Sequence, residues 1–490
     1  MDVTLAQGTF RGAREHGVLT FKGIPYAAPP VGDHRFAPPR RPLPHEGVAD
    51  ATAYGPTVST PPQRSAVMGE LLPDPVRPGA NGLNLNVWTP DPEANLPVFV
   101  WIHGGGFVTG AGSTTAFDGT AFARDGVVAV TINYRLAAEG FLFLPDAVPN
   151  RGLLDQIAAL EWVRDNIAAF GGDPDLVTVA GESAGAMAVL TLVTMPRARG
   201  LVRRAIAQSG DGHHVHPPEV ARLFTSELCA ELGVPRSVDG IAGVAVDALH
   251  AATNEVITRV SAGHDRRFAE FRRLALQPVI DGEVVPRHPV EAAGDGDTNG
   301  IDLMIGTNAE EYGLFCAPTG LADAMDDQLL AATVARLGVD PGTMIERYRS
   351  EMPGATPAEL FVAIQSDWFC AVPAVRYTDA RREAGAASHV YEFAWRPDTY
   401  GGKLGACHTL EIPFVFETLD DPWGIALRGP GAPRELAAAV HRAWVDFVTT
   451  GDPGWECYGA ARRVRRLDLC STTVEDPGAF RRRAWESVIQ

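Results

Sequence analysis

A serine lies between two glycines in the segment Gly181-Glu182-Ser183-Ala184-Gly185. The segment follows an apolar, β-branched run at 176–180 and precedes a helix-compatible run at 186–192. A strand, a tight turn and a helix in this order are the context that a nucleophile elbow needs, in which the glycines leave room for a serine held in a strained turn above a sheet. A strand-to-helix turn with a capping serine gives the same local pattern. The motif therefore needs partner residues elsewhere before it indicates nucleophilic catalysis.

A second glycine-rich segment, His103-Gly104-Gly105-Gly106-Phe107, directly follows the apolar run at 96–102. Glycines allow several backbone N–H groups to converge on one oxygen, because no Cβ atom obstructs the approach. Loops of this type supply donors to an oxyanion hole, although a flexible glycine turn is the alternative interpretation. We expect the loop to lie in the same sheet as the serine, on an earlier strand.

Serine catalysis also needs a base and an acidic residue, in the chain order serine, acid, histidine. His408 lies in a loop beyond the late apolar run at 390–394, where a base is expected, whereas His441 falls inside a helical pattern and is predicted to be at the surface. Glu310 and Glu311 follow the apolar run at 302–306, at a strand end where α/β active sites form. The residues alone leave the choice between these two acids open.

The elements that must position these residues alternate along the chain. Continuous apolar runs are typical of strands that are buried on both faces of a parallel sheet. An amphipathic helix is predicted over 153–170, and a closing helix over 434–448. The predicted strands lie at 96–102, 127–132, 176–180, 204–208, 302–306 and 390–394. Strands that alternate with helices predict an α/β fold with right-handed crossovers.

Further segments extend the motifs above into a pattern that resembles the type-B carboxylesterase family, which includes the cholinesterases and the bacterial para-nitrobenzyl esterases. The resemblance covers nearly the whole chain. Its most specific part is the stretch from 152 to 174, which leads into the serine motif. The other matching segments are 21–27 (FKGIPYA), 85–90 (LNVWTP), 101–107 (WIHGGGF), 133–135 (NYR), 208–210 (QSG) and 408–416 (HTLEIPFVF).

The resemblance implies that Ser183 is the nucleophile, that Glu311 is the acid and that His408 is the base. Tyr312 stands where the family has a glycine, so Glu310 remains the alternative acid. The implied oxyanion donors are the N–H groups of Gly105, Gly106 and Ala184. No metal and no cofactor are needed for this chemistry.

The length of 490 residues suggests about three domains by size alone. The candidate site nevertheless draws on residues from 103 to 408, which separate domains could not readily assemble. We therefore expect residues 1–490 to form a single enlarged α/β-hydrolase domain with a large, mostly parallel sheet flanked by helices. Helical insertions at about 211–300 and 320–385 are expected to cover the active site and shape its pocket.

Composition excludes several partners. The net charge of −18 disfavours nucleic acid, and no apolar run reaches the roughly 18 residues needed to span a bilayer. The first residues contain neither a basic nor an apolar region of a signal peptide, and the six cysteines form no CxxC pair. We therefore expect reduced, mostly buried thiols and a cytoplasmic, bacterial protein, as a monomer or homodimer, without a membrane partner.

The expected substrates are small to medium, hydrophobic carboxylic esters, with a specialised carbamate, anilide or natural-product ester as the alternative. A non-catalytic binding homologue is disfavoured, because the serine, an acid and the histidine are all present. Four aromatic residues are candidates for the pocket wall, with ordinary core packing as the alternative for each: Phe107, Phe315, Trp368 and Phe369. The segment 213–216 (HHVH) fits no standard zinc spacing and is predicted to be a solvated or pocket-edge loop.

Overall fold

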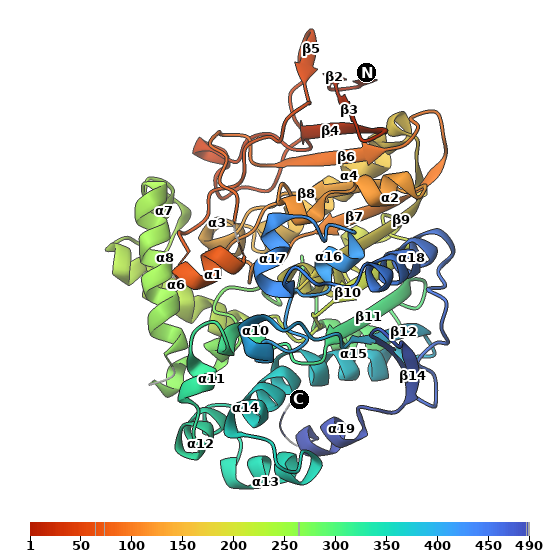
Figure 1. Cartoon of the computed structure of the whole chain (residues 1–490). Coiled ribbons are helices and arrows are strands. Elements are labelled where there is room, and N and C mark those ends of the chain that lie inside the picture. Colours follow the sequence, from red (N-terminus) through yellow and green to blue (C-terminus); the bar gives the residue numbers. More distant parts are fainter. Residues whose placement is uncertain (64, 73, 263–264, 487, 489–490) are drawn as a thin grey trace.

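A large twisted sheet forms the middle of the molecule (Figure 1). The structure is a computed structural model that describes residues 1–490 except 64, 73, 263–264, 487 and 489–490. Within these described residues the sheet has eleven strands. In spatial order they are β14 (Thr472–Glu475), β13 (Arg463–Leu467), β12 (Ser388–Phe393), β11 (Asp302–Asn308), β10 (Arg204–Gln208), β9 (Gly172–Glu182), β7 (Leu96–Ile102), β8 (Val128–Ile132), β6 (Asn84–Thr89), β4 (Val18–Pro25) and β3 (Ala13–Glu15).

The central strands, which run from β13 to β8 in the spatial order above, all pair in parallel. The outer strands pair antiparallel. Each apolar run singled out in the sequence forms one of the central strands, which confirms the predicted mostly parallel sheet. The N-terminal residues add a small separate sheet of β1 (Asp2–Leu5), β2 (Gly8–Arg11) and β5 (Val48–Asp50).

The register of the central strands brings their carboxyl ends to one edge. Ile102 of β7 pairs with Gly181 of β9, and Glu182 pairs with Gln208 of β10. Gln208 in turn pairs with Gly306 of β11. The segments that follow these strands, which include the glycine-rich loop and the serine motif, therefore meet above the same edge of the sheet.

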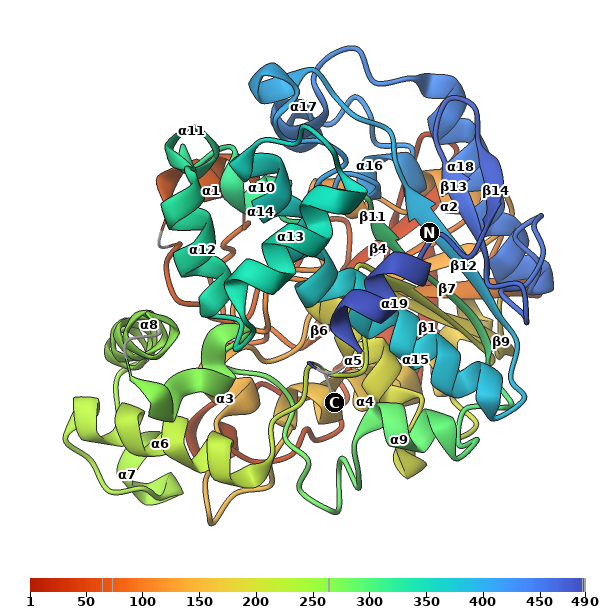
Figure 2. The ribbon, with the colours of Figure 1, turned by 90° about the horizontal axis from the view of Figure 1, so that it is seen from below.

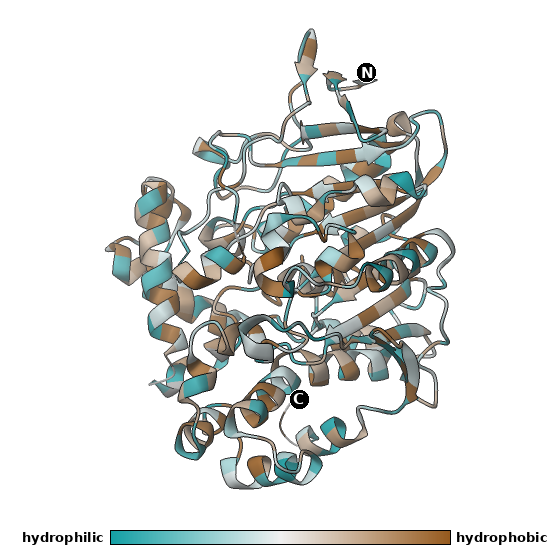
Figure 3. Cartoon of the chain, viewed as in Figure 1, coloured by the Kyte–Doolittle hydropathy of each residue, from teal (hydrophilic) through white to brown (hydrophobic). Residues whose placement is uncertain are grey.

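Side chains of β7 alternate between two hydrophobic clusters, one on each face of the sheet. Val98, Val100 and Ile102 belong to the cluster that packs against α4 (Arg151–Asn166), α5 (Ala184–Leu192) and α15 (Val372–Glu383). Phe99 and Trp101 belong to the other cluster, with α2 (Thr120–Arg124) and α18 (Arg434–Thr450). Helices cover both faces, which explains why the central strands are mostly apolar (Figure 3).

Two groups of helices interrupt the alternation. Between β10 and β11 lie α6 (Pro218–Leu232), α7 (Val238–Ala242), α8 (Val246–Ser261) and α9 (Pro289–Gly294). Between β11 and β12 lie α10 (Gly313–Cys316), α11 (Leu321–Ala324), α12 (Asp327–Ala335), α13 (Pro341–Glu351), α14 (Pro357–Ser366) and α15. Seen from below, α6–α8 lie at the lower left of the view, and α11–α13 form a separate group above them that reaches the middle of the molecule (Figure 2).

The remaining helices complete the frame around the sheet. The closing helix α18 buries its apolar stripe, with Trp444 and Phe447 fully covered. His441 is buried as well, with Nδ1 2.7 Å from the Val415 carbonyl, so the prediction of a surface position was wrong. The other helices used below are α1 (Ala66–Leu71), α3 (Ala137–Phe141), α16 (Ile412–Val415), α17 (Pro422–Arg428) and α19 (Ala479–Trp485).

One described stretch of continuous helix, Pro357–Glu383, is long and apolar enough to cross a membrane by length and composition. Of its most apolar window, 72% is buried inside the protein. An apolar helical stretch that is covered by its own fold is typical of the core of a large protein.

Candidate active site

Ser183 sits at the turn between strand β9 and helix α5. Its backbone has φ 54° and ψ −125°, a combination that L residues adopt at a cost of about 1–3 kcal/mol. The flanking glycines make the turn possible. A Cβ atom on Gly181 would lie 2.5 Å from the Gly185 backbone, and one on Gly185 would lie 2.0 Å from the Ile102 carbonyl oxygen. The sequence thus holds a serine in the strained turn of a nucleophile elbow.

His408 and Glu311 form a buried, hydrogen-bonded pair. The Nδ1 atom of His408 is 2.7 Å from Oε2 of Glu311, and the other carboxylate oxygen accepts a bond from the Asn308 N–H at 2.8 Å. The backbone N–H of His408 also donates to the backbone carbonyl oxygen of Glu311 at 3.1 Å. Two bonds from the loop that carries His408 and one from the end of β11 thus hold Glu311 and the imidazole in place. A proton on Nδ1 leaves Nε2 as the basic nitrogen.

The carboxylate of Glu310, the alternative acid, contacts other residues than His408. Its carboxylate accepts a bond from the Ala406 N–H at 2.6 Å and lies 3.5 Å from Arg396. Gly405 has a φ of +60°, and a Cβ atom there would lie 2.8 Å from that carboxylate. Glu310 therefore supports the loop that precedes His408, while Glu311 contacts the imidazole itself.

The glycine-rich loop lies against the serine turn. A Cβ atom on Gly104 would come within 3.0 Å of Ser183 Cβ, and Gly105 and Gly106 have φ values of +105° and +62°. Gly105, Gly106 and Ser183 line the same cavity. In the described part of the chain, no atom accepts a hydrogen bond from the N–H groups of Gly105, Gly106 or Ala184. These donors can therefore serve an oxygen bound in the cavity.

Glu182 is a contact that the sequence did not predict. Its Oε1 atom lies 3.1 Å from Nε2 of His408, and both side chains are buried. Burial lowers the pKa of His408, but the negative charges of Glu182 and Glu311 outweigh burial and raise it to about 9. For Glu182 the main effect is burial, which raises the pKa of its carboxyl group. Among the described contacts, no hydrogen bond joins Ser183 Oγ to His408, which is common before substrate binds.

Glu411 is a second acidic residue whose role the sequence did not reveal. It is fully buried and accepts bonds from Gln208 Nε2 at 3.0 Å and from Asn308 Nδ2 at 2.6 Å. Asn308 also donates to the Cys407 carbonyl oxygen at 2.6 Å. The network ties the His408 loop to the ends of β10 and β11. An acid within the apolar run 410–416 was the one available signal.

A cavity of about 290 Å³ opens above Ser183 and His408. Phe315 and Phe369 line it, and the Phe315 ring centroid lies 5.7 Å from that of His408. The remaining wall is mostly apolar, a composition typical of sites for small organic ligands. Its other large apolar side chains are those of Met68, Leu72, Phe117, Leu274, Ile412 and Trp423.

Two expected wall residues lie elsewhere. Phe107 is completely buried and packs against Phe141 with ring centroids 4.8 Å apart, because a positive φ of 61° turns it away from the loop. Trp368 is not among the lining residues, and the Arg273 guanidinium lies 5.0 Å above its ring. For these two residues, core packing explains the aromatic side chain.

Comparison with known proteins agrees with this geometry. A family model described as "Carboxylesterase family" matches residues 1–464. The chain belongs to the carboxylesterase family. It is 38% identical to the para-nitrobenzyl esterase of Bacillus subtilis (strain 168) over 497 residues, which cover 98% of this chain and 97% of that protein. It is 34% identical to phenmedipham hydrolase of Pseudarthrobacter oxydans over 488 residues, which cover 96% and 94% of the two proteins.

Solved structures show the same fold. A Geobacillus stearothermophilus carboxylesterase superimposes on this carboxylesterase with a TM-score of 0.84 at 35% identity, over 99% of both chains. A structure named PNB esterase gives 0.83 at 34% identity, again over 99% of both chains. The predicted α/β-hydrolase fold is thereby confirmed, and the chain is a carboxylic ester hydrolase.

The histidine-rich segment of this carboxylesterase is not a solvated loop. His213, His214 and His216 are all buried, and His214 Nδ1 lies 2.9 Å from Asp211. The His214 ring packs against Phe369 at 5.0 Å, so the pair lies directly behind the cavity wall. Of the two predicted positions, the solvated loop was wrong, because helices inserted after β10 and β11 cover the segment, whereas the edge of the pocket agrees with the contact between His214 and Phe369.

Among the described residues, one group has three ligand atoms close enough to share a metal ion: Glu311, Cys370 and His408, whose atoms lie within 4.8 Å of one another. Two of these three residues already form the hydrogen-bonded pair described above, and burial raises the pKa of the Cys370 thiol. A protonated thiol is a poor metal ligand. The group is therefore better described as part of the acid–base network.

Proposed function

We propose that this carboxylesterase hydrolyses small to medium, hydrophobic esters through an acyl-enzyme on Ser183. The observation that carries the proposal is the 2.7 Å bond between His408 and Glu311 beside a strained serine in one apolar cavity. His408 takes the proton of Ser183 as Oγ attacks the ester carbonyl and gives it to the leaving alcohol. Water then attacks the acyl-enzyme by the same route.

Glu311 holds the imidazole so that Nδ1 carries the proton, and its charge stabilises the imidazolium that forms during attack. The N–H groups of Gly105, Gly106 and Ala184 stabilise the oxyanion. The loss of one such donor would raise the barrier by about 2.7–4 kcal/mol. The scheme uses side chains and backbone donors of this chain alone.

The remaining features of the proposal concern the whole molecule. Residues 1–490 form one domain, in which the helical insertions at about 211–300 and 320–385 shape the pocket. Of the aromatic wall residues, Phe369 lies in the second insertion and Phe315 just before it. The net charge of −18 supports the absence of a nucleic-acid partner. We also infer a cytoplasmic, bacterial protein that acts as a monomer or homodimer and has no membrane partner.

A specialised hydrolase that cleaves a carbamate, an anilide or a natural-product ester is the alternative. The match to a protein named phenmedipham hydrolase is compatible with it. A panel of esters, carbamates and anilides with the same aryl leaving group separates the two, because the proposal expects the highest kcat/KM for the esters.

The nucleophile is tested by mapping the adduct of a phosphonate probe and by the Ser183→Ala substitution. We expect the adduct on Ser183 and a loss of para-nitrophenyl acetate turnover of about a thousandfold or more. Ser209→Ala is the matched control, since Ser209 also has a positive φ (52°) after the neighbouring strand but is fully buried. Turnover that survives in Ser183→Ala would overturn the assignment.

A further inference from the structure

A second cavity, which we call the α8 chamber, adjoins the cavity above Ser183 and His408. It has a volume of about 460 Å³, and its lining residues come from the segment 59–63, from 74 and 76, and from helix α8. Gln63 and Asp74 line both spaces. An ester that is too long for the cavity above Ser183 can therefore extend past these two side chains into the α8 chamber.

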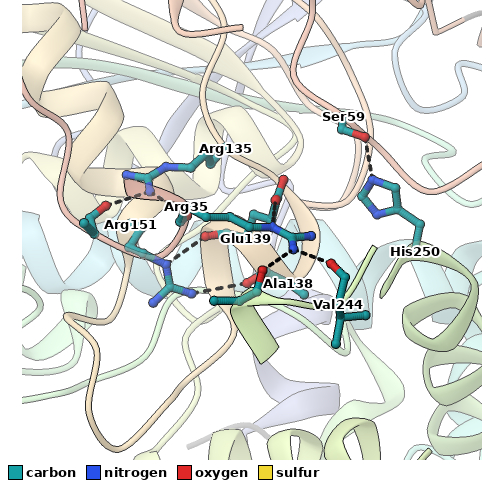
Figure 4. A network of polar contacts seen from close by, with 10 residues as sticks. Arg35, Ser59, Arg135, Ala138, Glu139, Arg151, Val244 and His250 are labelled. Atoms are coloured by element: carbon teal, nitrogen blue, oxygen red, sulfur yellow. Dashed lines mark hydrogen bonds and ion pairs between the residues drawn. The ribbon is translucent and has the colours of Figure 1, made fainter. Parts of the chain in front are cut away.

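The walls of the α8 chamber are fixed by polar contacts (Figure 4). Ser59 Oγ lies 2.7 Å from Nε2 of His250, which joins the segment 59–63 to α8. Arg35 donates to the carbonyl oxygens of Ala242 and Val244, immediately before α8, and pairs with Glu139 at 2.6 Å. A chamber that is built before the ligand arrives costs less ordering when the ligand binds.

Asp74 stands where the two spaces meet. Its Oδ2 atom accepts a bond from the Gly110 N–H at 3.1 Å, and the Thr60 side chain also hydrogen-bonds to the carboxylate. A carboxylate has about four lone-pair sites, so it can accept further donors. Burial has removed much of its water, and a charged donor would replace that lost hydration.

The chemistry of the α8 chamber points to a particular donor. Asp247 lines it as well, and none of the described residues that line either space is a lysine or an arginine. Apart from the His250 imidazole, no aromatic ring among these described residues lines the chamber, so it lacks the cage that a quaternary ammonium would prefer. Carboxylates without such a cage favour an ammonium group that can donate hydrogen bonds.

We propose that Asp74 is a specificity-determining residue through which this carboxylesterase selects esters that carry a primary or secondary ammonium group remote from the ester bond. The ammonium group occupies the α8 chamber side of Asp74, while the ester carbonyl lies at Ser183. The inference rests on the proposed ester hydrolysis and names a substrate class for that same site.

The test compares three para-nitrophenyl esters of similar length: the ω-aminooctanoate, the neutral nonanoate and the half-ester of suberic acid. Acetates of ω-aminooctanol and of nonanol place the same groups on the alcohol side. The deciding quantity is the ratio of kcat/KM for the ammonium ester to that for the neutral ester. In Asp74→Asn this ratio should fall about tenfold or more on at least one of the two sides, because a charge-assisted hydrogen bond is lost.

Matched variants separate the charge of Asp74 from its position. Asp74→Glu should keep the ratio within about threefold, and Asp247→Asn should lower it less than Asp74→Asn does. Asp239→Asn removes an exposed carboxylate of α7 that lines neither space and should leave the ratio unchanged. Arg64 follows Gln63 in the sequence but lies outside the described residues, so Arg64→Gln is made in parallel and should not lower the ratio.

An unchanged ratio in Asp74→Asn on both sides overturns the inference. If that variant does not fold, inhibition of the wild-type enzyme decides instead: octylammonium should inhibit para-nitrophenyl acetate hydrolysis more strongly than octanol does, and equal inhibition overturns the inference. Failure of the proposed function looks different, because the neutral esters would then not be hydrolysed, or would still be hydrolysed by Ser183→Ala.

Discussion

Two neighbouring strand ends carry nearly the same set of side chains. Strand β9 ends at Glu182 and is followed by Ser183, beside which Glu311 and His408 form their hydrogen-bonded pair. Strand β10 is followed by Ser209, which also has a positive φ, and by the pair of Asp211 and His214 at 2.9 Å. Both sets contain a serine with a positive φ and an acid whose carboxylate lies within 2.9 Å of a histidine nitrogen.

The two sets differ in what surrounds them. Ser183 and His408 line a cavity with the glycine-rich loop opposite, whereas Ser209, Asp211 and His214 are covered on all sides. An acid–histidine pair without access for a substrate and without oxyanion donors can stabilise the fold but cannot catalyse. Side-chain type and pairing distance therefore do not define the site; the cavity and the glycine loop do.

The largest expected effect comes from removing the acid of each pair. Glu311→Gln should lower kcat by about 10³–10⁴-fold, because the imidazole loses both its tautomer control and the charge that stabilises the imidazolium. Asp211→Asn should keep kcat within about threefold but lower the free energy of unfolding by about 1.5–3 kcal/mol, since the buried bond from the His213 N–H loses its charged acceptor and His214 loses its neighbouring charge.

Steady-state kinetics with para-nitrophenyl acetate and thermal unfolding of both variants check the contrast. A loss of kcat in Asp211→Asn comparable with that in Glu311→Gln would show that the two pairs are not functionally distinct. Asp239→Asn, on the exposed side of α7, serves as the control for a generic change of charge.

Phe369 separates the two sets, because its ring packs against His214 on one side and lines the cavity on the other. Phe369→Ala should enlarge the cavity toward the buried pair. The ratio of kcat/KM for a bulky aryl ester to that for the acetate should rise about tenfold, which corresponds to about 1.4 kcal/mol of pocket fit. Phe107→Leu is the control, since Phe107 packs away from the cavity; the same rise in that variant would refute Phe369 as the dividing wall.

The fold was readable from the sequence where one local signal dominates. Apolar β-branched runs predicted the central strands, and the ends of β7, β10 and β11 fall within about two residues of the predicted positions. The GxSxG spacing predicted the strained turn at Ser183, because only glycine tolerates the backbone contacts made by Gly181 and Gly185.

Features that depend on distant packing were not readable. Glu182 reaches His408 only because β9 and the loop after β12 end at the same edge, and Phe107 leaves the pocket because its backbone turns at a positive φ. The burial of His214 and His441 depends on helices far away in sequence. No local pattern records which face of a residue another element will cover.

The pH dependence of activity distinguishes the pairs more finely. His408 must lose its proton to act as a base, and its pKa is raised to about 9, so kcat/KM should rise with pH up to the mildly alkaline range. Glu182→Gln removes one of the negative charges that raise this pKa, so the midpoint of the rise should move to lower pH by about one unit. Asp211→Asn should leave the midpoint in place, and an equal shift in both variants would contradict the separation.

The smallest expected effect concerns the acid next to Glu311. Glu310 accepts the Ala406 N–H at 2.6 Å and does not contact the imidazole, and a glutamine can still accept that bond. Glu310→Gln should therefore change kcat/KM by less than about threefold and lower the thermal midpoint only slightly. Parallel rates for Glu310→Gln and Glu311→Gln on one ester measure this directly. If only Glu310→Gln lost activity, the acid that orients the imidazole would be Glu310. The 2.7 Å contact of Glu311 with His408 would then have only a structural role, like the contact of Asp211 with His214.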